Sequence, residues 1–196
     1  MNERETIQAA KQGDVAAFNR LVMAHQGLAY NVAFRLMGDA DAAADATQEA
    51  FLKAFRAIGQ YRGGSFKSWL LRIVTNACYD QLRYHQRRPT EPLLPETNDD
   101  GTPAEHAARL MDSAESPEDF ALRRELNEML QQAILRLPPD QRLILVLSDA
   151  EGFGYREIAD ITGLPLGTVK SRLSRARSRL RDLLQEQELL PSQYRL

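Results

Sequence analysis

Residues 155–176 read YREIADITGLPLGTVKSRLSRA, and this stretch decides the fold of the C-terminal third of the chain. Ala159 is small enough for a second helix to cross the first at close range, and Gly163, four residues later, supplies a left-handed turn conformation. In the helix that follows, Val169 and Leu173 turn an apolar face back onto the first helix. This spacing predicts a helix-turn-helix.

The outer face of the second helix carries the charge expected of a helix that binds DNA. Residues 165–181 hold six cations and no acid, whereas a solvated helix usually mixes both signs. In the major groove, Arg and Lys donate to guanine, Ser lets the backbone approach, and other cations neutralise phosphates. We therefore expect this face to bind DNA through Lys170, Ser171, Ser174 and Arg175, with Arg172 and Arg177 at its flanks.

The rest of the chain also shows helical periodicity, so the predicted fold class is all-α. Apolar residues recur at spacings of three and four, and no stretch alternates apolar and polar residues as a half-buried strand would. His25 and Cys78 fall on these apolar stripes and are expected to pack rather than to bind a ligand. Ser65 is expected to cap the helix that follows it. The helical stretches are 18–36, 51–58, 66–78, 122–137 and 140–150.

Charge divides the chain into three segments. Its 196 residues are 43% apolar and 27% charged, which suits one folded domain or two small ones. The net charge of −2 hides +3 in residues 1–95, −7 in residues 96–120 and +2 in residues 121–196. Turn-forming residues in and just before this acidic segment interrupt any periodic pattern, namely Pro89, Pro92, Pro95, Asn98, Gly101, Pro103 and Pro117. We expect two small helical domains, 1–95 and 121–196, joined by a flexible acidic linker, 96–120.

Several function classes are excluded by composition and motif. Cys78 is the single cysteine, which excludes an internal disulfide and a thiolate-rich zinc site. No apolar run reaches the roughly 18 residues of a membrane span and the N-terminus is polar, so a cytoplasmic protein without membrane insertion is expected. His25, His85 and His106 are scattered, and no phosphate-binding Gly-rich loop is present. We expect no catalytic residue, no cofactor and no metal.

Further motifs carry a resemblance to a known family. Residues 13–18 read GDVAAF, residues 45–55 read DATQEAFLKAF, residues 61–70 read YRGGSFKSWL and residues 167–176 read GTVKSRLSRA. In this order, around an acidic linker, they resemble the extracytoplasmic-function (ECF) sigma factors, the minimal two-domain members of the bacterial sigma factor family. The resemblance extends over almost the whole chain.

The resemblance implies a dissociable specificity subunit of RNA polymerase rather than an enzyme. The helix at 45–55 would dock on the clamp helices of the largest polymerase subunit, and residues 121–150 on the flap tip of the second-largest. The loop from Tyr61 to Trp69 would read the −10 promoter element as a single strand, where aromatic groups stack, cations bind the backbone and a flipped base is captured. The implied polymerase-binding residues are Asp45, Gln48, Glu49 and Lys53, whereas Phe51 and Phe55 of the same helix are expected in the core. The implied −10 residues are Tyr61, Arg62, Ser65, Phe66, Lys67, Trp69, Arg72 and Asn76.

The same resemblance makes the second helix of the helix-turn-helix the reader of the −35 element in duplex DNA. Ser174 is shorter than the side chain that some relatives carry at this position. The resemblance also implies an anti-sigma factor, which would hold the protein near the membrane, and an acidic linker that either occupies basic channels built for RNA or acts as a plain spacer. The implied −35 residues are Thr168, Lys170, Ser171, Arg172, Ser174, Arg175 and Arg177.

Two other function classes are alternatives to this interpretation. An activator that binds a palindromic operator would need a ligand cavity and a dimer interface, and neither shows in the sequence. A DNA-processing enzyme would need a metal cluster, for which Asp39, Asp41, Asp45 and Glu49 are the candidates, although their Ala-rich spacing argues against it. Phe66 and Trp69 also lie on an apolar stripe, so core packing remains open for both.

Overall fold

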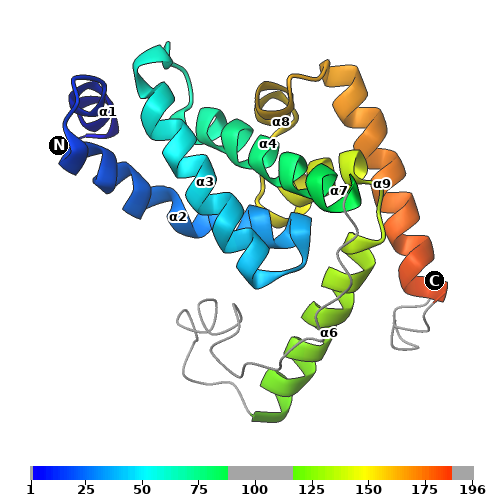
Figure 1. Ribbon diagram of the computed structural model, residues 1–196. Coiled ribbons are helices and arrows are strands. Elements are labelled where there is room, and N and C mark those ends of the chain that lie inside the picture. The colour runs from blue at the N-terminus through cyan, green and yellow to red at the C-terminus, as the bar shows by residue number, and fades with distance from the viewer. Residues whose placement is uncertain (1, 88–116, 187–196) are drawn as a thin grey trace.

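Every element that the structure describes is a helix. The computed structural model describes residues 2–87, here called the N-terminal part, and residues 117–186, the C-terminal part. The predicted all-α fold class is confirmed (Figure 1). The expected linker between residues 96 and 116 lies outside the described residues.

The N-terminal part contains α1 (Glu3–Lys11), α2 (Val15–Met37), α3 (Ala40–Ala57), a 3-10 turn η1 (Ile58–Gln60) and α4 (Phe66–Arg87). The C-terminal part contains α6 (Pro117–Leu135), α7 (Pro139–Leu145), a π-helical turn η2 (Val146–Ala150), α8 (Tyr155–Thr162) and α9 (Leu166–Glu186).

Polar side chains determine where the helices of the N-terminal part begin. Asp14 at α2, Asp39 at α3 and Ser65 at α4 each accept a hydrogen bond from the backbone N–H three residues later, as a capping residue does. Ser65 therefore caps α4 as predicted. In the C-terminal part, α6 begins at Pro117, where a proline is tolerated because the N–H of the first turn has no helical partner. The last residues of the expected linker segment 96–120 are thus helical.

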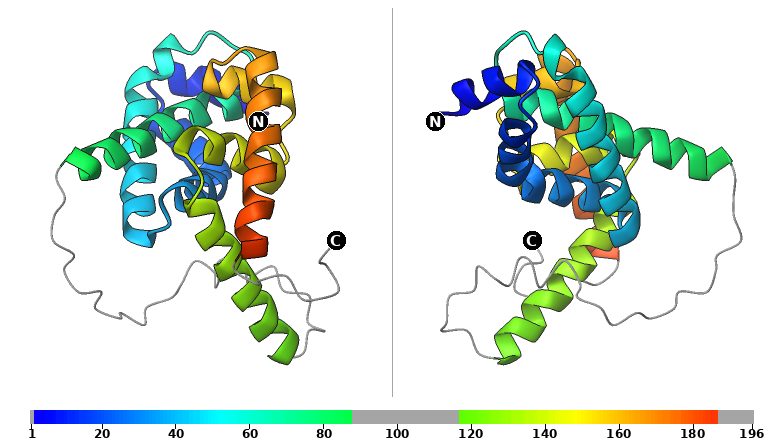
Figure 2. Two further views of the ribbon diagram at one scale, coloured as in Figure 1. Left: turned by 90° about the vertical axis from the view of Figure 1, so that its right-hand side faces the viewer. Right: turned by 60° about the vertical axis from the view of Figure 1, so that its left-hand side comes forward.

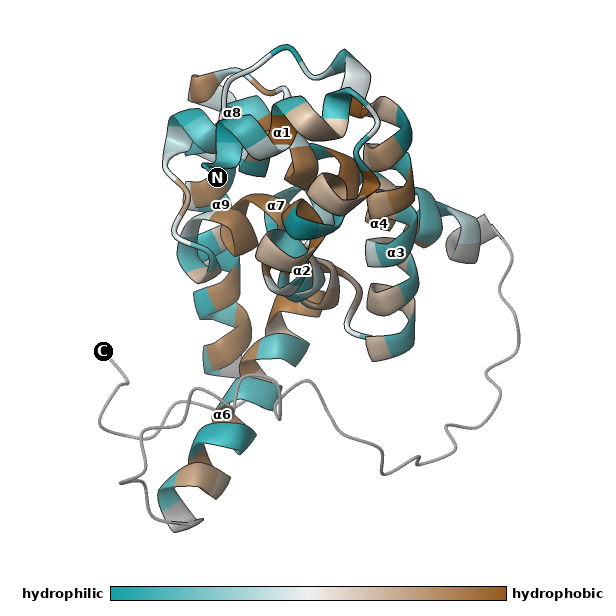
Figure 3. Ribbon diagram, turned by 90° about the vertical axis from the view of Figure 1, so that its left-hand side faces the viewer, coloured by the Kyte–Doolittle hydropathy of each residue, from teal (hydrophilic) through white to brown (hydrophobic). Residues whose placement is uncertain are grey.

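The two parts share one apolar core. Leu36 and Leu70 from the N-terminal part and Leu147 and Ile158 from the C-terminal part are almost completely buried in the same cluster. Helix α4 packs against α8, and α2 packs against α6 and α7. The two views of Figure 2 show the helices gathered into one body from which α6 projects. In Figure 3, apolar segments gather where the helices meet, whereas α8 turns hydrophilic residues outward.

Helices α8 and α9 form the predicted helix-turn-helix. Gly163 has a φ of 71°, in the left-handed region, and its N–H donates to the carbonyl of Ala159 at 2.8 Å. Val169 and Leu173 are 0% and 2% exposed, which confirms the predicted inner face of α9. The turn therefore leaves the opposite face of α9 open to solvent.

His25 and Cys78 take the packing positions that their place on apolar stripes predicts. Cys78 is fully buried, and burial raises the pKa of its thiol to about 12, so the group stays protonated at neutral pH. His25 lies with its ring centroid 5.4 Å from that of Phe66, and its Nε2 is 3.2 Å from a carboxylate oxygen of Glu3. Neither residue is free for a separate chemical role.

Candidate nucleic-acid interface

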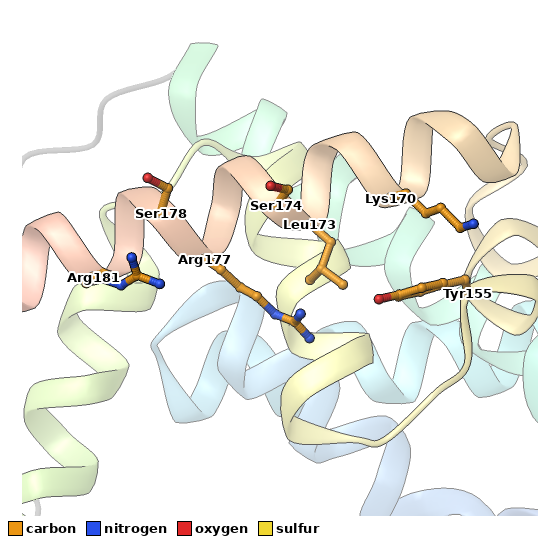
Figure 4. A pocket seen from close by; sticks show the side chains of 7 residues that line it. All are labelled: Tyr155, Lys170, Leu173, Ser174, Arg177, Ser178 and Arg181. Atoms are coloured by element: carbon orange, nitrogen blue, oxygen red, sulfur yellow. The ribbon is translucent and has the colours of Figure 1, made fainter.

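The exposed face of α9 presents polar and cationic side chains in a row. In Figure 4, Lys170, Leu173 and Arg177 lie along α9 and face a shallow groove that Tyr155 of α8 closes at one end. The groove has a volume of about 330 Å³, and the Lys170 ammonium lies 5.9 Å from the centroid of the Tyr155 ring. Of the predicted −35 residues, Thr168 and Arg172 are half-buried, and Lys170, Ser171, Ser174, Arg175 and Arg177 are exposed.

Two of the predicted cations pair with acids of the C-terminal part. Arg177 donates to both carboxylate oxygens of Asp149, at 2.9 and 2.6 Å, and these bonds hold the pKa of Asp149 below its ordinary value. Arg172 Nη1 lies 3.3 Å from a carboxylate oxygen of Asp140. Arg175, in contrast, forms no ion pair with another residue of the two described ranges. Arg172 and Arg177 thus fasten α9 to the elements beneath it, and the Arg175 side chain remains exposed to solvent.

An aromatic cluster supports the loop between η1 and α4. Tyr61 and Phe66 are 7% and 3% exposed, and the Trp69 ring centroid lies 5.4 Å from each of theirs. The Tyr61 hydroxyl donates to the carbonyl of Gly64 at 2.8 Å, and Lys11 of α1 donates to the carbonyl of Tyr61 at 3.0 Å. Tyr61 and Phe66 therefore lie beneath the loop with no ring face open to a base, and they hold its shape.

The remaining predicted −10 residues lie on the loop before α4 and along α4 itself. The Lys67 ammonium lies 4.1 Å from the centroid of the Phe153 ring, which belongs to the C-terminal part. Arg72 and Asn76, one turn apart on α4, line a groove of about 440 Å³ between α4 and helices α7, α8 and α9. Arg72 and Asn76 thus share one face of α4, whereas Lys67 lies half a helical turn away from Asn76 around the helix. By exposure, Arg62, Ser65, Arg72 and Asn76 are open to solvent, and Lys67 and Trp69 are half-buried.

The predicted polymerase-binding residues share the outer face of α3. Asp45 and Gln48 are exposed, and the side chains of Glu49 and Lys53 keep 44% and 41% of their surface. The Lys53 ammonium lies 2.8 Å from a carboxylate oxygen of Glu49 and 3.7 Å from one of Asp80 on α4, and the hydrogen bond to Glu49 raises the Lys53 pKa. This face lies on the side of α3 opposite the core and is open to a partner.

Two exposed apolar side chains of α3 lie beside this surface, and the sequence alone did not indicate either as a candidate binding residue. Leu52 is 52% exposed, one turn after Gln48. Phe55, expected in the core, is 39% exposed, although its ring edge packs on Phe18 with centroids 5.0 Å apart. The signal that would have found Leu52 is its position, because an apolar residue four places after Gln48 falls on the charged face. Exposed apolar groups on a charged face suit a protein contact.

The described ranges contain neither a candidate metal-binding cluster nor a candidate membrane-spanning helix. Within residues 2–87 and 117–186, no group of three or more His, Cys, Asp or Glu side chains is placed to hold a metal ion. Over the same residues, no helix combines the length and apolar character needed to cross a bilayer.

Comparison with known proteins assigns both parts to one family. Residues 21–88 match the family model of Sigma-70 region 2, and residues 127–180 match that of Sigma-70, region 4. The ECF RNA polymerase sigma-E factor of Escherichia coli K12 is 34% identical over 188 residues, which are 94% of this chain and 95% of the relative. The chain belongs to the ECF sigma factors. This membership implies a promoter-specific, non-catalytic specificity subunit of RNA polymerase.

Two further relatives of this ECF sigma factor agree with that assignment. The RNA polymerase sigma-H factor of Pseudomonas aeruginosa is 36% identical over 184 residues, 93% of this chain and 94% of the relative. A solved structure of the sigma factor RpoE in complex with the anti-sigma factor NepR, from Bartonella quintana, is 26% identical, with a TM-score of 0.63 over 87% of this chain and 98% of that one. The region 2 match spans α3 and the loop before α4, and the region 4 match spans the helix-turn-helix.

Proposed function

We propose that this ECF sigma factor binds core RNA polymerase, directs it to promoters through a −35 and a −10 element, and promotes DNA opening at the start of transcription. The proposal rests on one observation, namely that each of the two family matches contains an exposed basic surface. One surface lies on α9, within the region 4 match, and the other on the loop and α4, within the region 2 match.

The surface of α9 would read the −35 element as duplex DNA. A recognition helix contacts base edges from its first turns, and a cation there donates to guanine O6 and N7. Lys170 and Arg175 are exposed in these turns, with Ser171 and Ser174 short enough to let the backbone approach. Arg177, bound to Asp149, would keep the angle of α9 fixed on the C-terminal part.

The surface of α4 would bind the −10 element as a single strand. Arg62 and Lys67 supply cations for the backbone, and the half-buried Trp69 supplies an aromatic ring for stacking. Arg72 and Asn76 supply donors that suit a base held out of the stack. Capture of such a base favours the opened strands, which is how a protein without a catalytic site lowers the free energy of promoter melting.

We assign two further surfaces to contacts with other proteins. We assign the outer face of α3, with Asp45, Gln48, Glu49 and Lys53, to the clamp helices of the largest polymerase subunit. Residues 121–150 suit the flap tip of the second-largest subunit, because Leu122 and Leu126 lie one turn apart on α6 and are 56% and 42% exposed. The likeness to RpoE in complex with NepR supports an anti-sigma partner for this chain as well.

Asn76→Ala is expected to slow promoter opening by about fivefold, because the variant loses one hydrogen bond of about 1 kcal/mol to the captured base. Potassium permanganate oxidation of unpaired thymines in the −10 region, with core polymerase and the whole chain, measures the opened fraction over time. A template with mismatches at the −10 element is the control, and the variant should recover on it because the strands are already unpaired. Unchanged opening on duplex DNA would remove Asn76 from the base contact.

A further inference from the structure

Helix α1 lies outside the region 2 match, yet it contacts the segment that would bind the −10 strand. A capping box between Asn2 and Glu5 fixes its first turn, with hydrogen bonds of 3.0 and 2.9 Å. The helix packs against α2 and η1, and its buried residues are Thr6, Ile7 and Ala10. Helix α1 is therefore held firmly beside the loop between η1 and α4.

The first attachment joins the end of α1 to the start of this loop. The Lys11 ammonium donates to the carbonyl of Tyr61, the C-cap residue of η1, at 3.0 Å. The Tyr61 hydroxyl in turn donates to the carbonyl of Gly64 at 2.8 Å, across the loop. Gly63 and Gly64 have φ values of 100° and 93°, and glycine is the residue whose backbone is least restricted. The loop therefore depends on these hydrogen bonds for its shape.

The second attachment joins the start of α1 to the start of α4. The His25 Nε2 atom lies 3.2 Å from a carboxylate oxygen of Glu3, and the His25 ring centroid lies 5.4 Å from that of Phe66. Phe66 is the first residue of α4 and is buried. Burial raises the pKa of the Tyr61 hydroxyl, and the charge of the Glu3 carboxylate adds to this rise. Helix α1 thus acts on both ends of the loop.

The residues between and beside these attachments are the ones that would meet DNA. Arg62 and Ser65 are exposed, and the half-buried Trp69 has its ring centroid 5.4 Å from those of Tyr61 and Phe66. A site whose groups already stand in the binding arrangement binds more tightly, because less conformational entropy is lost on binding. The contacts of α1 therefore affect how well these groups are placed for a single strand.

We propose that α1 positions the −10 surface, and that Lys11 is a positioning residue whose hydrogen bond to the Tyr61 carbonyl holds the loop in the shape that binds a single strand. This inference rests on the proposed function. A hydrogen bond from a charged donor is stronger than one between neutral groups, and this one joins residues 50 positions apart. It therefore fixes the loop to the body of the N-terminal part. Glu3 acts on the other end of the loop through His25.

Lys11→Met tests the first attachment, because methionine keeps an unbranched side chain and cannot donate a hydrogen bond. Arg4→Met is the matched control, since Arg4 is an exposed cation of the same helix and its charge also acts on the Tyr61 pKa. Lys11→Arg restores a charged donor and is the rescue variant. Circular dichroism should show that all three variants keep their helices and melt nearly as the wild type does.

Hydrogen exchange of the full chain, followed by mass spectrometry, measures the loop directly and needs no DNA. The amides of Tyr61, Ser68 and Trp69 are hydrogen-bonded around the loop. Peptides that cover residues 61–69 should exchange about fivefold faster in Lys11→Met, because one hydrogen bond that holds the loop is lost. Peptides of α8 and α9 should not change, and Arg4→Met and Lys11→Arg should match the wild type. Unchanged exchange of the loop in Lys11→Met would overturn the positioning role.

Strand binding is measured with the sigma factor bound to core RNA polymerase and a labelled single-stranded oligonucleotide that carries the −10 motif. This motif is taken from the transcripts that the protein starts on randomised promoters, and a scrambled oligonucleotide gives the non-specific affinity. Lys11→Met should reduce the ratio of the two affinities by about fivefold, and Lys11→Arg should restore it. Arg4→Met should keep the ratio of the wild type, and all variants should keep its affinity for core polymerase.

Two outcomes of the binding experiment would overturn the proposal. Equal weakening on both oligonucleotides would make Lys11 a phosphate contact, which carries no sequence discrimination. An unchanged ratio in Lys11→Met would show that the hydrogen bond does not matter for recognition. A wild type that binds both oligonucleotides equally would instead refute the proposed function at the −10 element, while hydrogen exchange still decides whether α1 holds the loop.

Discussion

Arg175→Ala is expected to reduce transcription from a −35-dependent promoter by about 10- to 100-fold and to leave the affinity for core polymerase unchanged. Arg175 is exposed on the outer face of α9 and forms no ion pair within the described ranges, so its guanidinium is free to bind a base edge. A bidentate contact to guanine contributes about 1–3 kcal/mol of discrimination. Run-off transcription on one promoter, with and without an intact −35 element, measures the loss.

Arg179→Ala is the matched control for this variant. Arg179 is an exposed arginine one turn farther along α9 and lies outside the predicted −35 set. Its removal should change transcription less than threefold, because a phosphate contact far from the first turns adds little sequence discrimination. Equal losses in both variants would show that α9 contributes general positive charge rather than base recognition, and reduced core affinity in Arg175→Ala would contradict the division of roles between the two parts.

Leu52→Asp should weaken binding to core polymerase by at least about 30-fold without unfolding the protein. Leu52 is 52% exposed on α3 and has little packing to lose in the free chain. In a complex with the clamp helices, the new carboxylate would be buried without a partner, and such a change at the centre of an interface costs about 2 kcal/mol or more. Fluorescence anisotropy of the labelled sigma factor, titrated with core polymerase, measures the affinity.

Met23→Asp is the comparison for Leu52→Asp. Met23 on α2 is the more exposed of the two at 69%, and it lies outside the proposed polymerase surface. The same chemical change there should leave core affinity within about twofold and the melting temperature nearly unchanged. If both variants bind core polymerase like the wild type, the outer face of α3 is not the docking surface.

Local features of the fold were predictable from the sequence because neighbouring residues determine them. Gly163 allowed the left-handed turn, and the spacing of Val169 and Leu173 set the inner face of α9. Ser65 stands three residues before the N–H that it caps, so a short window of sequence contained the whole signal.

Contacts between distant residues were not predictable in the same way. Arg177 was expected at the DNA, but 28 positions earlier in the chain stands Asp149, which binds it on both carboxylate oxygens. The Arg142 guanidinium donates to the carbonyl of Leu36, 106 positions away, and no local pattern around Arg142 indicates this partner. Such pairs depend on how the helices pack, and helical periodicity carries no information on that.

The candidate site shows the same division. The resemblance implied that the loop from Tyr61 to Trp69 reads single-stranded DNA. It gave no sign that Tyr61 is buried, or that Lys11 of α1, outside the region 2 match, donates to the Tyr61 carbonyl. Leu52 was overlooked because its neighbours Phe51 and Phe55 suggested a core stripe, whereas exposure places it with the charged face. The DNA-binding and polymerase-binding roles themselves remain predictions that the variants above test.

Run-off transcription on a pool of randomised promoters, with purified core polymerase and with or without this protein, tests the central claim most directly. Sequencing of the transcripts should reveal new start sites that share a −35 and a −10 motif at a constant spacing, and only in the reactions that contain the protein. Failure of active protein and its cognate core polymerase to give any new start site, while the protein alone still shifts duplex DNA, would contradict the sigma factor function and favour an operator-binding activator.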